Sequence, residues 1–165
     1  YAHQAEYLNK LYANSANTLR MIVLRSAQTK EFELCFAVQR IGADWTGAVD
    51  NGSRGGLVAN VDIATGEMSH ARTLHNLTVY ETHPDTGAAI RGTVIPNWQA
   101  LKQGVLDISR RFPYLDIIAW DILPTDDGFT VIEANTSSGV NIIQLWGPQR
   151  YGRLGDFYRE HGIIK

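Results

Sequence analysis

The sequence lacks the features that would assign it to a membrane, to nucleic acid or to a disulfide-stabilised fold. Its 165 residues carry 15 Lys and Arg against 17 Asp and Glu, so no basic surface for nucleic acid is expected. No apolar run approaches the roughly 20 residues of a membrane-spanning helix. The one cysteine, Cys35, has no partner for an internal disulfide, and the apolar run at 32–38 predicts a buried thiol. These absences favour a cytoplasmic protein with no nucleic-acid and no membrane partner.

Common catalytic signatures are also missing. Neither GKS nor GKT occurs in the chain, so there is no Walker A loop, and there is no GxGxxG dinucleotide fingerprint. The five histidines show no metal-ligand spacing. Ser53 and Ser137 have no identifiable His and Asp partners, so a serine nucleophile is not supported. The remaining composition, 44% hydrophobic and 19% charged, is that of one globular domain long enough to bury a core.

The order of the predicted elements indicates the fold class. Apolar β-rich runs predict strands at 18–25, 31–41 and 57–63, two short strands within 68–81, and a hairpin from 114–123 and 129–134. Pro96 opens the clearest predicted helix and Pro113 ends it, and further helices are predicted at 1–12, 141–146 and 154–161. Strands that precede a helix and a hairpin favour an α+β fold, with a mostly antiparallel sheet flanked by helices.

The predicted hairpin carries three side chains with oxygen donors. Asp121 lies on its first strand, and Glu133 and Asn135 lie on its second, after a Pro-Thr-Asp-Asp-Gly turn at 124–128 that predicts a longer loop. Because Glu133 and Asn135 are two positions apart, they point to the same face. Three hard oxygen ligands with no His or Cys nearby suit Mg²⁺, which is held by one or two carboxylates together with phosphates and water.

The spacing of the two acids also fits a structural interpretation, in which Asp121 ends a strand and Glu133 faces solvent. The context favours the metal, because Glu133 follows an apolar run and Asp121 lies within one, at 115–123. A carboxylate near a core is costly unless it is paired or bound to a cation.

A glycine-rich loop at 49–56 is the second candidate feature. Gly55 and Gly56 allow a backbone to approach a ligand closely, and Arg54 offers a planar set of donors that matches phosphate or carboxylate. The alternative is a surface turn with a solvated arginine. Arg20 and Arg40 lie in strand-like runs and are each open to the same structural interpretation. If all three arginines face the hairpin, they surround a metal site in the arrangement that phosphoryl transfer requires.

In order along the chain, these segments resemble the ATP-grasp superfamily, most closely its sugar-transfer-associated branch, and the later ones are similar to ribosomal-protein glutamate ligases. The resemblance is carried by Asn17-Thr18-Leu19-Arg20, Gln39-Arg40-Ile41-Gly42, Val49-Asp50-Asn51-Gly52 with Gly55-Gly56, Val61-Asp62 with Thr65-Gly66, His83-Pro84-Asp85-Thr86-Gly87, Ile95-Pro96-Asn97-Trp98, Trp120-Asp121 and Ile132-Glu133-Ala134-Asn135.

The resemblance implies a division of roles among these residues. Asp121, Glu133 and Asn135 would hold two Mg²⁺ ions that bridge the phosphates of ATP. The residues that would bind the nucleotide or line the phosphate and acyl-phosphate side are Arg20, Arg40, Asn51, Arg54, Gly55 and Gly56. The reaction it implies joins two small-molecule partners. A carboxylate attacks the γ-phosphate, and an amine or another nucleophile then captures the acyl phosphate.

The chain departs from the superfamily's pattern in two ways. The lysines that hold the nucleotide phosphates, the glycine-rich lid and the adenine-contacting hinge come from sequence N-terminal to what is present, so 1–165 is expected to be a single partial domain, the C-terminal half of the fold. Ala119 stands where some members carry an arginine two positions before the metal-binding aspartate. We therefore expect this chain alone to bind Mg²⁺ and phosphate weakly and not to turn over. The alternatives are a non-catalytic ATP-grasp-like nucleotide-binding module and a metal-dependent phosphohydrolase.

Overall fold

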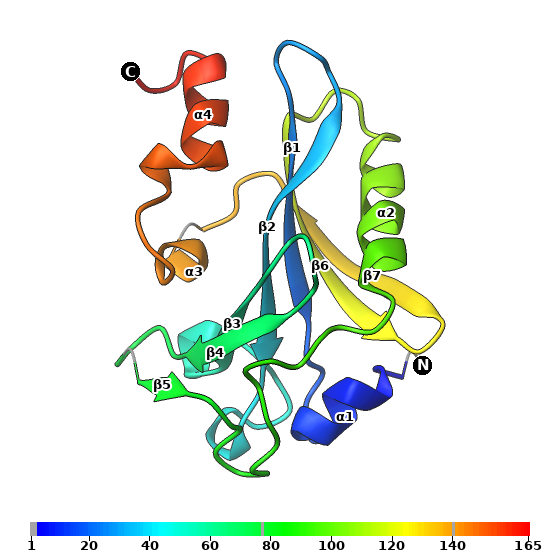
Figure 1. The fold of residues 1–165 in the computed structure, drawn as a ribbon, viewed down its shortest axis with the longest axis vertical. Helices are drawn as coiled ribbons and strands as arrows, with labels where there is room; N and C mark the ends of the chain where they lie inside the picture. Colours follow the sequence, from blue (N-terminus) through cyan, green and yellow to red (C-terminus); the bar gives the residue numbers. More distant parts are fainter. Residues whose placement is uncertain (1–2, 77, 140) are drawn as a thin grey trace.

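A twisted antiparallel sheet divides the molecule, and helices lie on both of its faces (Figure 1). The computed structural model describes residues 3–76, 78–139 and 141–165. Within these residues the helices are α1 (Glu6–Tyr12), α2 (Trp98–Ser109), α3 (Asn141–Gln144) and α4 (Arg153–Glu160), with short 3₁₀ turns at Asp44–Thr46, Gly52–Arg54 and Gln149–Tyr151. The strands are β1 (Leu19–Arg25), β2 (Phe32–Ile41), β3 (Leu57–Val61), β4 (Met68–Arg72), β5 (Val79–Tyr80), β6 (Ile117–Thr125) and β7 (Gly128–Asn135).

The strand order confirms the predicted α+β class. The described strands form one sheet in the order β5-β4-β3-β2-β1-β6-β7, and each neighbouring pair is antiparallel. The strand β1 therefore lies inside the sheet, with β2 on one side and β6 on the other, and both neighbours bring side chains to the same two faces.

One face of the sheet is covered by α1 and α2 and carries the larger core. On β1 this face receives Leu19, Met21 and Val23, all fully buried. The helix α2 packs against it with Trp98, Leu101 and Val105, whose spacing of three and four places them on one side of the helix. The apolar side of α2 and the alternate apolar residues of β1 thus pack together in one layer.

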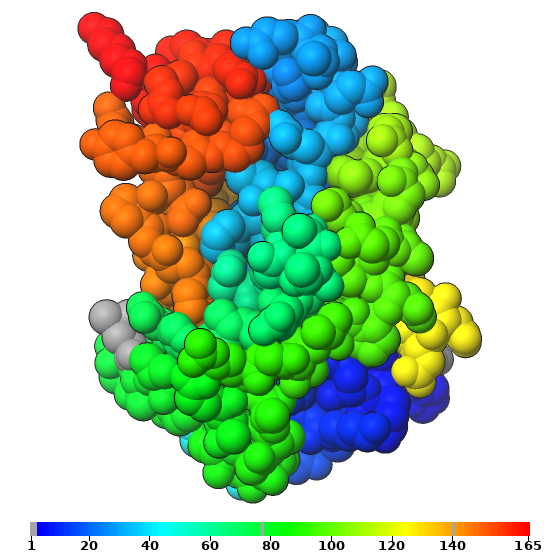
Figure 2. All heavy atoms as spheres, viewed as in Figure 1, coloured from blue at the N-terminus to red at the C-terminus, as the bar shows by residue number. Residues whose placement is uncertain are grey.

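The other face is covered in part by α3 and α4. Its smaller cluster uses the alternate residues Ile22 and Leu24 of β1, together with Ile142 of α3 and Phe157 of α4. At the top of the molecule, α4 lies against the tip of the β1–β2 hairpin (Figure 2), where Arg153 pairs with Glu33 at 2.5 Å. None of the helices in the described ranges is long and apolar enough to cross a membrane.

The predicted elements all form, but several boundaries differ. Helix α2 begins after Asn97, which takes a left-handed conformation (φ 53°), and it ends before Pro113 is reached. The hairpin turn has two residues, Asp126 and Asp127, so the prediction of a longer loop was wrong. Pro124 is part of β6, which tolerates it because β1 pairs with β6 only as far as Ile122.

Cys35 is half-buried against the α3–α4 cluster, whereas a buried thiol was expected. Burial raises the pKa of this thiol from 9.0 to about 11. The thiol is therefore neutral at physiological pH and a poor nucleophile.

Candidate functional site

The strand register brings the candidate acids and one candidate arginine onto neighbouring positions of one face. Arg20 of β1 is paired with Asp121 of β6, and Asp121 is paired in turn with Glu133 of β7. Asn135 lies opposite Ala119, two positions from Asp121. Directly paired residues point to the same side of a sheet, so Asp121, Glu133 and Asn135 share one face, as predicted.

Asp121 is the centre of an ion-pair network. Its Oδ1 accepts a bond from Arg20 Nε at 2.7 Å, and its Oδ2 accepts from Arg20 Nη2 at 2.6 Å and from Arg40 Nη1 at 3.2 Å. The Asp121 residue is 3% exposed. A buried carboxylate is costly unless it is paired, and here two guanidinium groups satisfy it.

The network continues from Arg40 to Asp50, in the loop before β3. Arg40 Nη2 donates to Asp50 Oδ1 at 2.9 Å. Asp50 Oδ2 accepts from the backbone N–H of Thr18 at 2.6 Å and also from the Thr18 hydroxyl. Asp50 is 6% exposed, so this second carboxylate is also buried and paired.

The charges reinforce one another. Hydrogen bonding to Asp121 raises the pKa of the Arg20 guanidinium, against the opposing effect of burial, and the charges of Glu133 and Asp50 act in the same direction as Asp121. Arg20 is therefore held firmly in its charged form.

A small pocket of about 180 Å³ lies on this side of the sheet. Two of its lining residues are cationic, Arg20 and Arg40, and Asn51, Ser53 and Asn141 add uncharged polar groups. Such a lining suits an anion with several oxygen atoms, because guanidinium and amide groups donate hydrogen bonds to it. Asp121, Glu133 and Asn135 are not among the residues that line this pocket.

The glycine-rich loop contributes less than expected. Asn51 lines the pocket, but Arg54 is exposed and does not. The structure brings Arg20 and Arg40 together at Asp121, whereas the expected third arginine lies outside this pocket.

The two glycines of the loop have structural reasons. Gly55 takes the left-handed conformation (φ 89°) that closes the short turn after Asn51. A Cβ on Gly56 would lie 2.5 Å from the carbonyl oxygen of Asp50. Both glycines therefore allow the loop to fold on itself, which is the alternative interpretation given above.

Glu133 is exposed, and the argument that placed it near the core was wrong. The strand β7 is the edge of the sheet, and most of its residues face solvent, including Ile132 at 56% exposure. An apolar run does not imply burial on both sides at a sheet edge. The exposed carboxylate of Glu133 is accessible to a ligand on the face it shares with Asp121.

The donor set can be compared with the Mg²⁺ that the resemblance implies. Two carboxylates and one amide on a shared face have the hard oxygen chemistry that Mg²⁺ requires. Within the described ranges, no three His, Cys, Asp or Glu side chains gather as a metal-binding group. The residues fit Mg²⁺ by chemistry, with phosphates and water completing its shell.

Asp50 and Thr18 were not singled out from the sequence. Their contacts join residues 32 positions apart, and no short motif announces such a pairing. The one available signal was that Asp50 is the single acid of the glycine-rich loop and follows Arg40 by ten residues.

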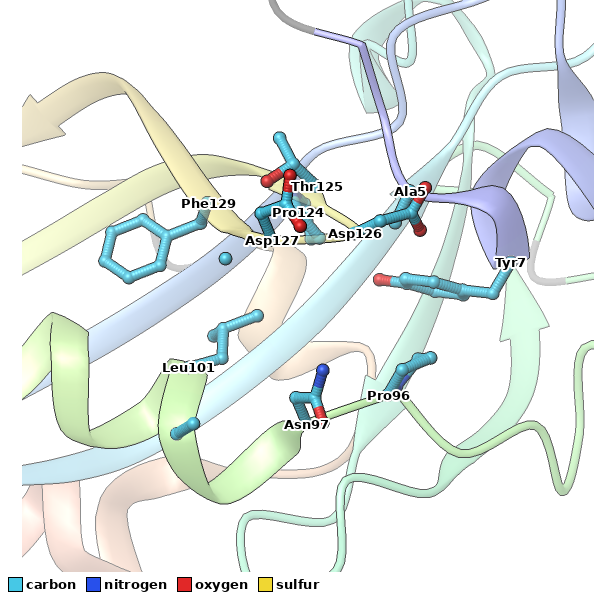
Figure 3. Close-up of a pocket in the computed structure, with 12 residues that line it drawn as sticks. Ala5, Tyr7, Pro96, Asn97, Leu101, Pro124, Thr125, Asp126, Asp127 and Phe129 are labelled. Carbon is cyan, nitrogen blue, oxygen red and sulfur yellow. The ribbon is translucent and has the colours of Figure 1, made fainter.

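A separate cavity of about 310 Å³ lies on the α2 side of the sheet, between the hairpin turn and the start of α2 (Figure 3). In Figure 3 Asp126 and Asp127 lie above it, and Pro96 and Asn97 lie below. Asp126 accepts a bond from the backbone N–H of Glu6 at 2.9 Å and so caps the start of α1. The Tyr7 hydroxyl donates to Gln39 at 3.0 Å, and burial raises its pKa. The cavity is therefore lined by the residues that hold α1, the β6–β7 hairpin and the start of α2 together.

Comparison with known proteins gives one result. The profile of a protein family described as sugar-transfer associated ATP-grasp matches residues 1–154. That range contains the whole ion-pair network, the glycine-rich loop and the hairpin. No match was found among curated proteins or among solved structures.

Proposed function

Since the chain belongs to the sugar-transfer-associated ATP-grasp family, we propose that it is the metal- and phosphate-binding half of an ATP-dependent ligase that forms an acyl phosphate. Its α+β architecture is that of an ATP-grasp subdomain. The observation that carries the proposal beyond the family is the pairing of Asp121 with Glu133 next to Arg20, with Asn135 on the same face.

In this proposal Asp121, Glu133 and Asn135 would hold Mg²⁺ together with the phosphates of ATP. The bound metal would neutralise charge on the transferring phosphoryl group. Arg20 and Arg40 donate hydrogen bonds to phosphate oxygens on the same face, where Asn51 adds an amide. Arg54 is exposed beside this region and has at most an outer position.

The proposed reaction begins with a small-molecule carboxylate as the attacking group. Buried guanidinium groups lower the cost of bringing this anion next to the negatively charged phosphate. The carboxylate oxygen bonds to the γ-phosphorus and ADP leaves, and an amine or another nucleophile then attacks the acyl carbon, loses a proton and releases inorganic phosphate. In the small pocket between Arg20, Arg40 and α3, the lining side chains would donate hydrogen bonds to the acyl-phosphate oxygens.

A non-catalytic nucleotide-binding module is the second candidate. It is favoured by one observation, that both oxygens of Asp121 already accept bonds from guanidinium groups. The same family membership supports both candidates, and turnover distinguishes them.

Thermal unfolding with Mg²⁺ and ATP tests the metal assignment. In the longest natural form of the protein, Mg²⁺ and ATP together should raise the midpoint of unfolding by several degrees, because a ligand that binds only the folded state stabilises it. Glu133→Ala should lose this gain. Glu133 is the suitable residue to change because it is exposed, so its replacement perturbs the fold little.

The matched control is Asp127→Ala, which removes an exposed acid from the turn of the same hairpin and should keep the full gain. Equal stabilisation of the wild type and of Glu133→Ala would refute the metal assignment. ATP-dependent formation of ADP with a carboxylate and an amine would support the ligase over the binding module.

A further inference from the structure

Arg20 and Arg40 donate hydrogen bonds to the carboxylate oxygens of Asp121, the same oxygens that would coordinate a metal ion. Arg20 is bidentate, with bonds of 2.7 and 2.6 Å to the two oxygens, and Arg40 adds a bond of 3.2 Å to Oδ2. Two positive charges this close oppose the approach of a divalent cation to the same carboxylate. An anion that draws a guanidinium away removes this opposition.

The two arginines differ in what else they hold. Arg40 Nη2 also donates to Asp50, at 2.9 Å, so Arg40 keeps a carboxylate partner when Asp121 is taken by another cation. In the described part of the chain, the hydrogen bonds that the Arg20 side chain donates all go to Asp121. Arg20 is therefore the one of the two that is left with no partner if a metal binds Asp121.

Asp50 is well placed to hold Arg40. Its Oδ2 accepts two bonds from Thr18, one from the backbone N–H and one from the hydroxyl, and its Oδ1 faces Arg40. Three bonds fix the carboxylate in a buried position. Arg40 is thus tied through Asp50 to the start of β1, independently of Asp121.

We infer that Arg20 is a displaceable cation on Asp121, so that the site accepts a divalent metal together with an oligophosphate anion and not the metal alone, while Asp50 is a positioning residue that keeps Arg40 in place. This inference rests on the proposed function. On binding, the Arg20 guanidinium would leave Asp121 for the phosphate oxygens, and the freed Asp121 carboxylate would hold the metal. Arg40 stays between Asp50 and the anion.

Calorimetric titration with Mn²⁺, which takes the same oxygen ligands as Mg²⁺, tests the displacement. Wild-type chain should bind free Mn²⁺ weakly and the preformed Mn²⁺–tripolyphosphate complex at least about tenfold more tightly. Arg20→Met removes the charge and keeps the bulk, so it should bind free Mn²⁺ about tenfold more tightly than wild type does, the scale of a nearby like charge. Arg20→Lys keeps the charge and should stay weak.

A double-mutant cycle tests Asp50. Asp50→Asn keeps an oxygen acceptor for Thr18 but loses the charge opposite Arg40, and it should weaken binding of the Mn²⁺–tripolyphosphate complex about tenfold. In the Arg40→Met background the same change should have little effect, because Asp50 acts through Arg40. A purely structural role would give the same loss in both backgrounds.

The outcomes separate this inference from the proposed function. If Arg20→Met binds free Mn²⁺ no better than wild type, while wild type binds the complex and Glu133→Ala does not, the displacement is refuted and the metal site stands. If wild type and Glu133→Ala bind the complex equally, the proposed metal site fails and the inference fails with it. Circular dichroism checks each variant, and Arg20→Gln replaces Arg20→Met if the latter does not fold.

Discussion

The two faces of the central sheet are built from alternate residues of the same strands, yet they bury different chemistry. On β1 one face receives Leu19, Met21 and Val23, and the other receives Arg20, Ile22 and Leu24. The first face meets α1 and α2 in a continuous apolar layer. The second meets α3 and α4 at one end and carries the paired charges at the other.

This difference separates the parts of the chain that secure the fold from those that can bind a ligand. An apolar layer stabilises the fold when it is shielded from water, because burial of apolar area is favourable whatever apolar group covers it. Buried charges gain only from specific partners, and each can exchange one partner for another of the same sign. When the apolar layer and the buried charges lie on opposite faces of the sheet, the charges can exchange partners while the apolar layer stays packed.

The largest effect is expected from removing the carboxylate at the centre of the charged face. Asp121→Ala leaves Arg20 and Arg40 close together with no acid between them, at 17% and 14% side-chain exposure. Breaking a buried pair in this way costs about 3–5 kcal/mol of unfolding free energy. Urea denaturation followed by tryptophan fluorescence measures it.

The matched control is Asp116→Ala, which removes an acid just before β6 that pairs with Arg25 at 3.6 Å and is 47% exposed. An exposed pair contributes about 0–1 kcal/mol, so this change should be nearly neutral. Similar costs for the two substitutions would mean that the charged face is open to water, and the contrast between the faces would fail.

The apolar face was largely predictable from the sequence, because periodicity reports burial directly. Trp98, Leu101 and Val105 have the spacing of one side of a helix and are the buried residues of α2, and the apolar run at 18–25 predicted β1. Boundaries were less certain, since Asn97 in a left-handed conformation delays the helix that Pro96 was expected to open. Local chemistry of this kind is not encoded in periodicity.

The charged face was predictable only in part. The position of Asp121 and Glu133 on neighbouring strands followed from a hairpin, which is a local structure, whereas their direct pairing depends on the two-residue turn that the structure shows. The contacts of Asp121 with Arg20 and of Asp50 with Thr18 join residues 101 and 32 positions apart, and they depend on which strands become neighbours. The exposure of Glu133 depends on β7 being the sheet edge, which a hairpin alone does not reveal.

A second prediction compares the two faces through one strand. Leu19 and Leu24 are both fully buried on β1, but they point to opposite clusters. Leu19→Ala should cost about 3–4 kcal/mol and Leu24→Ala about 2–3 kcal/mol. The reason is that a cavity costs less where the surroundings can relax, and the short helices α3 and α4 can move more easily than the larger layer under α2.

Chemical denaturation of the two variants measures this difference. Val23→Ala serves as an additional reference, because it makes a smaller cavity on the same face as Leu19. If Leu24→Ala costs as much as Leu19→Ala, the α3–α4 layer is as firmly packed as the α2 layer, and the proposed division between the faces is not one of rigidity.

The smallest effect on stability is expected at Cys35, which probes how tightly α3 and α4 cover the second face. Burial raises the pKa of its thiol from 9.0 to about 11, so the folded state favours the protonated form. The resulting contribution to stability is complete below about pH 9 and is lost as the pH rises through about 11.

At pH 8 the thiolate is about 100-fold scarcer than in the unfolded chain, and the thiol should react with a disulfide reagent about 100-fold more slowly. Reaction rates with and without urea measure the ratio, and Cys35→Ala should remove the alkaline loss of stability. Equal rates in the folded and unfolded states would show that α3 and α4 do not cover Cys35 and leave this part of the second face open to solvent.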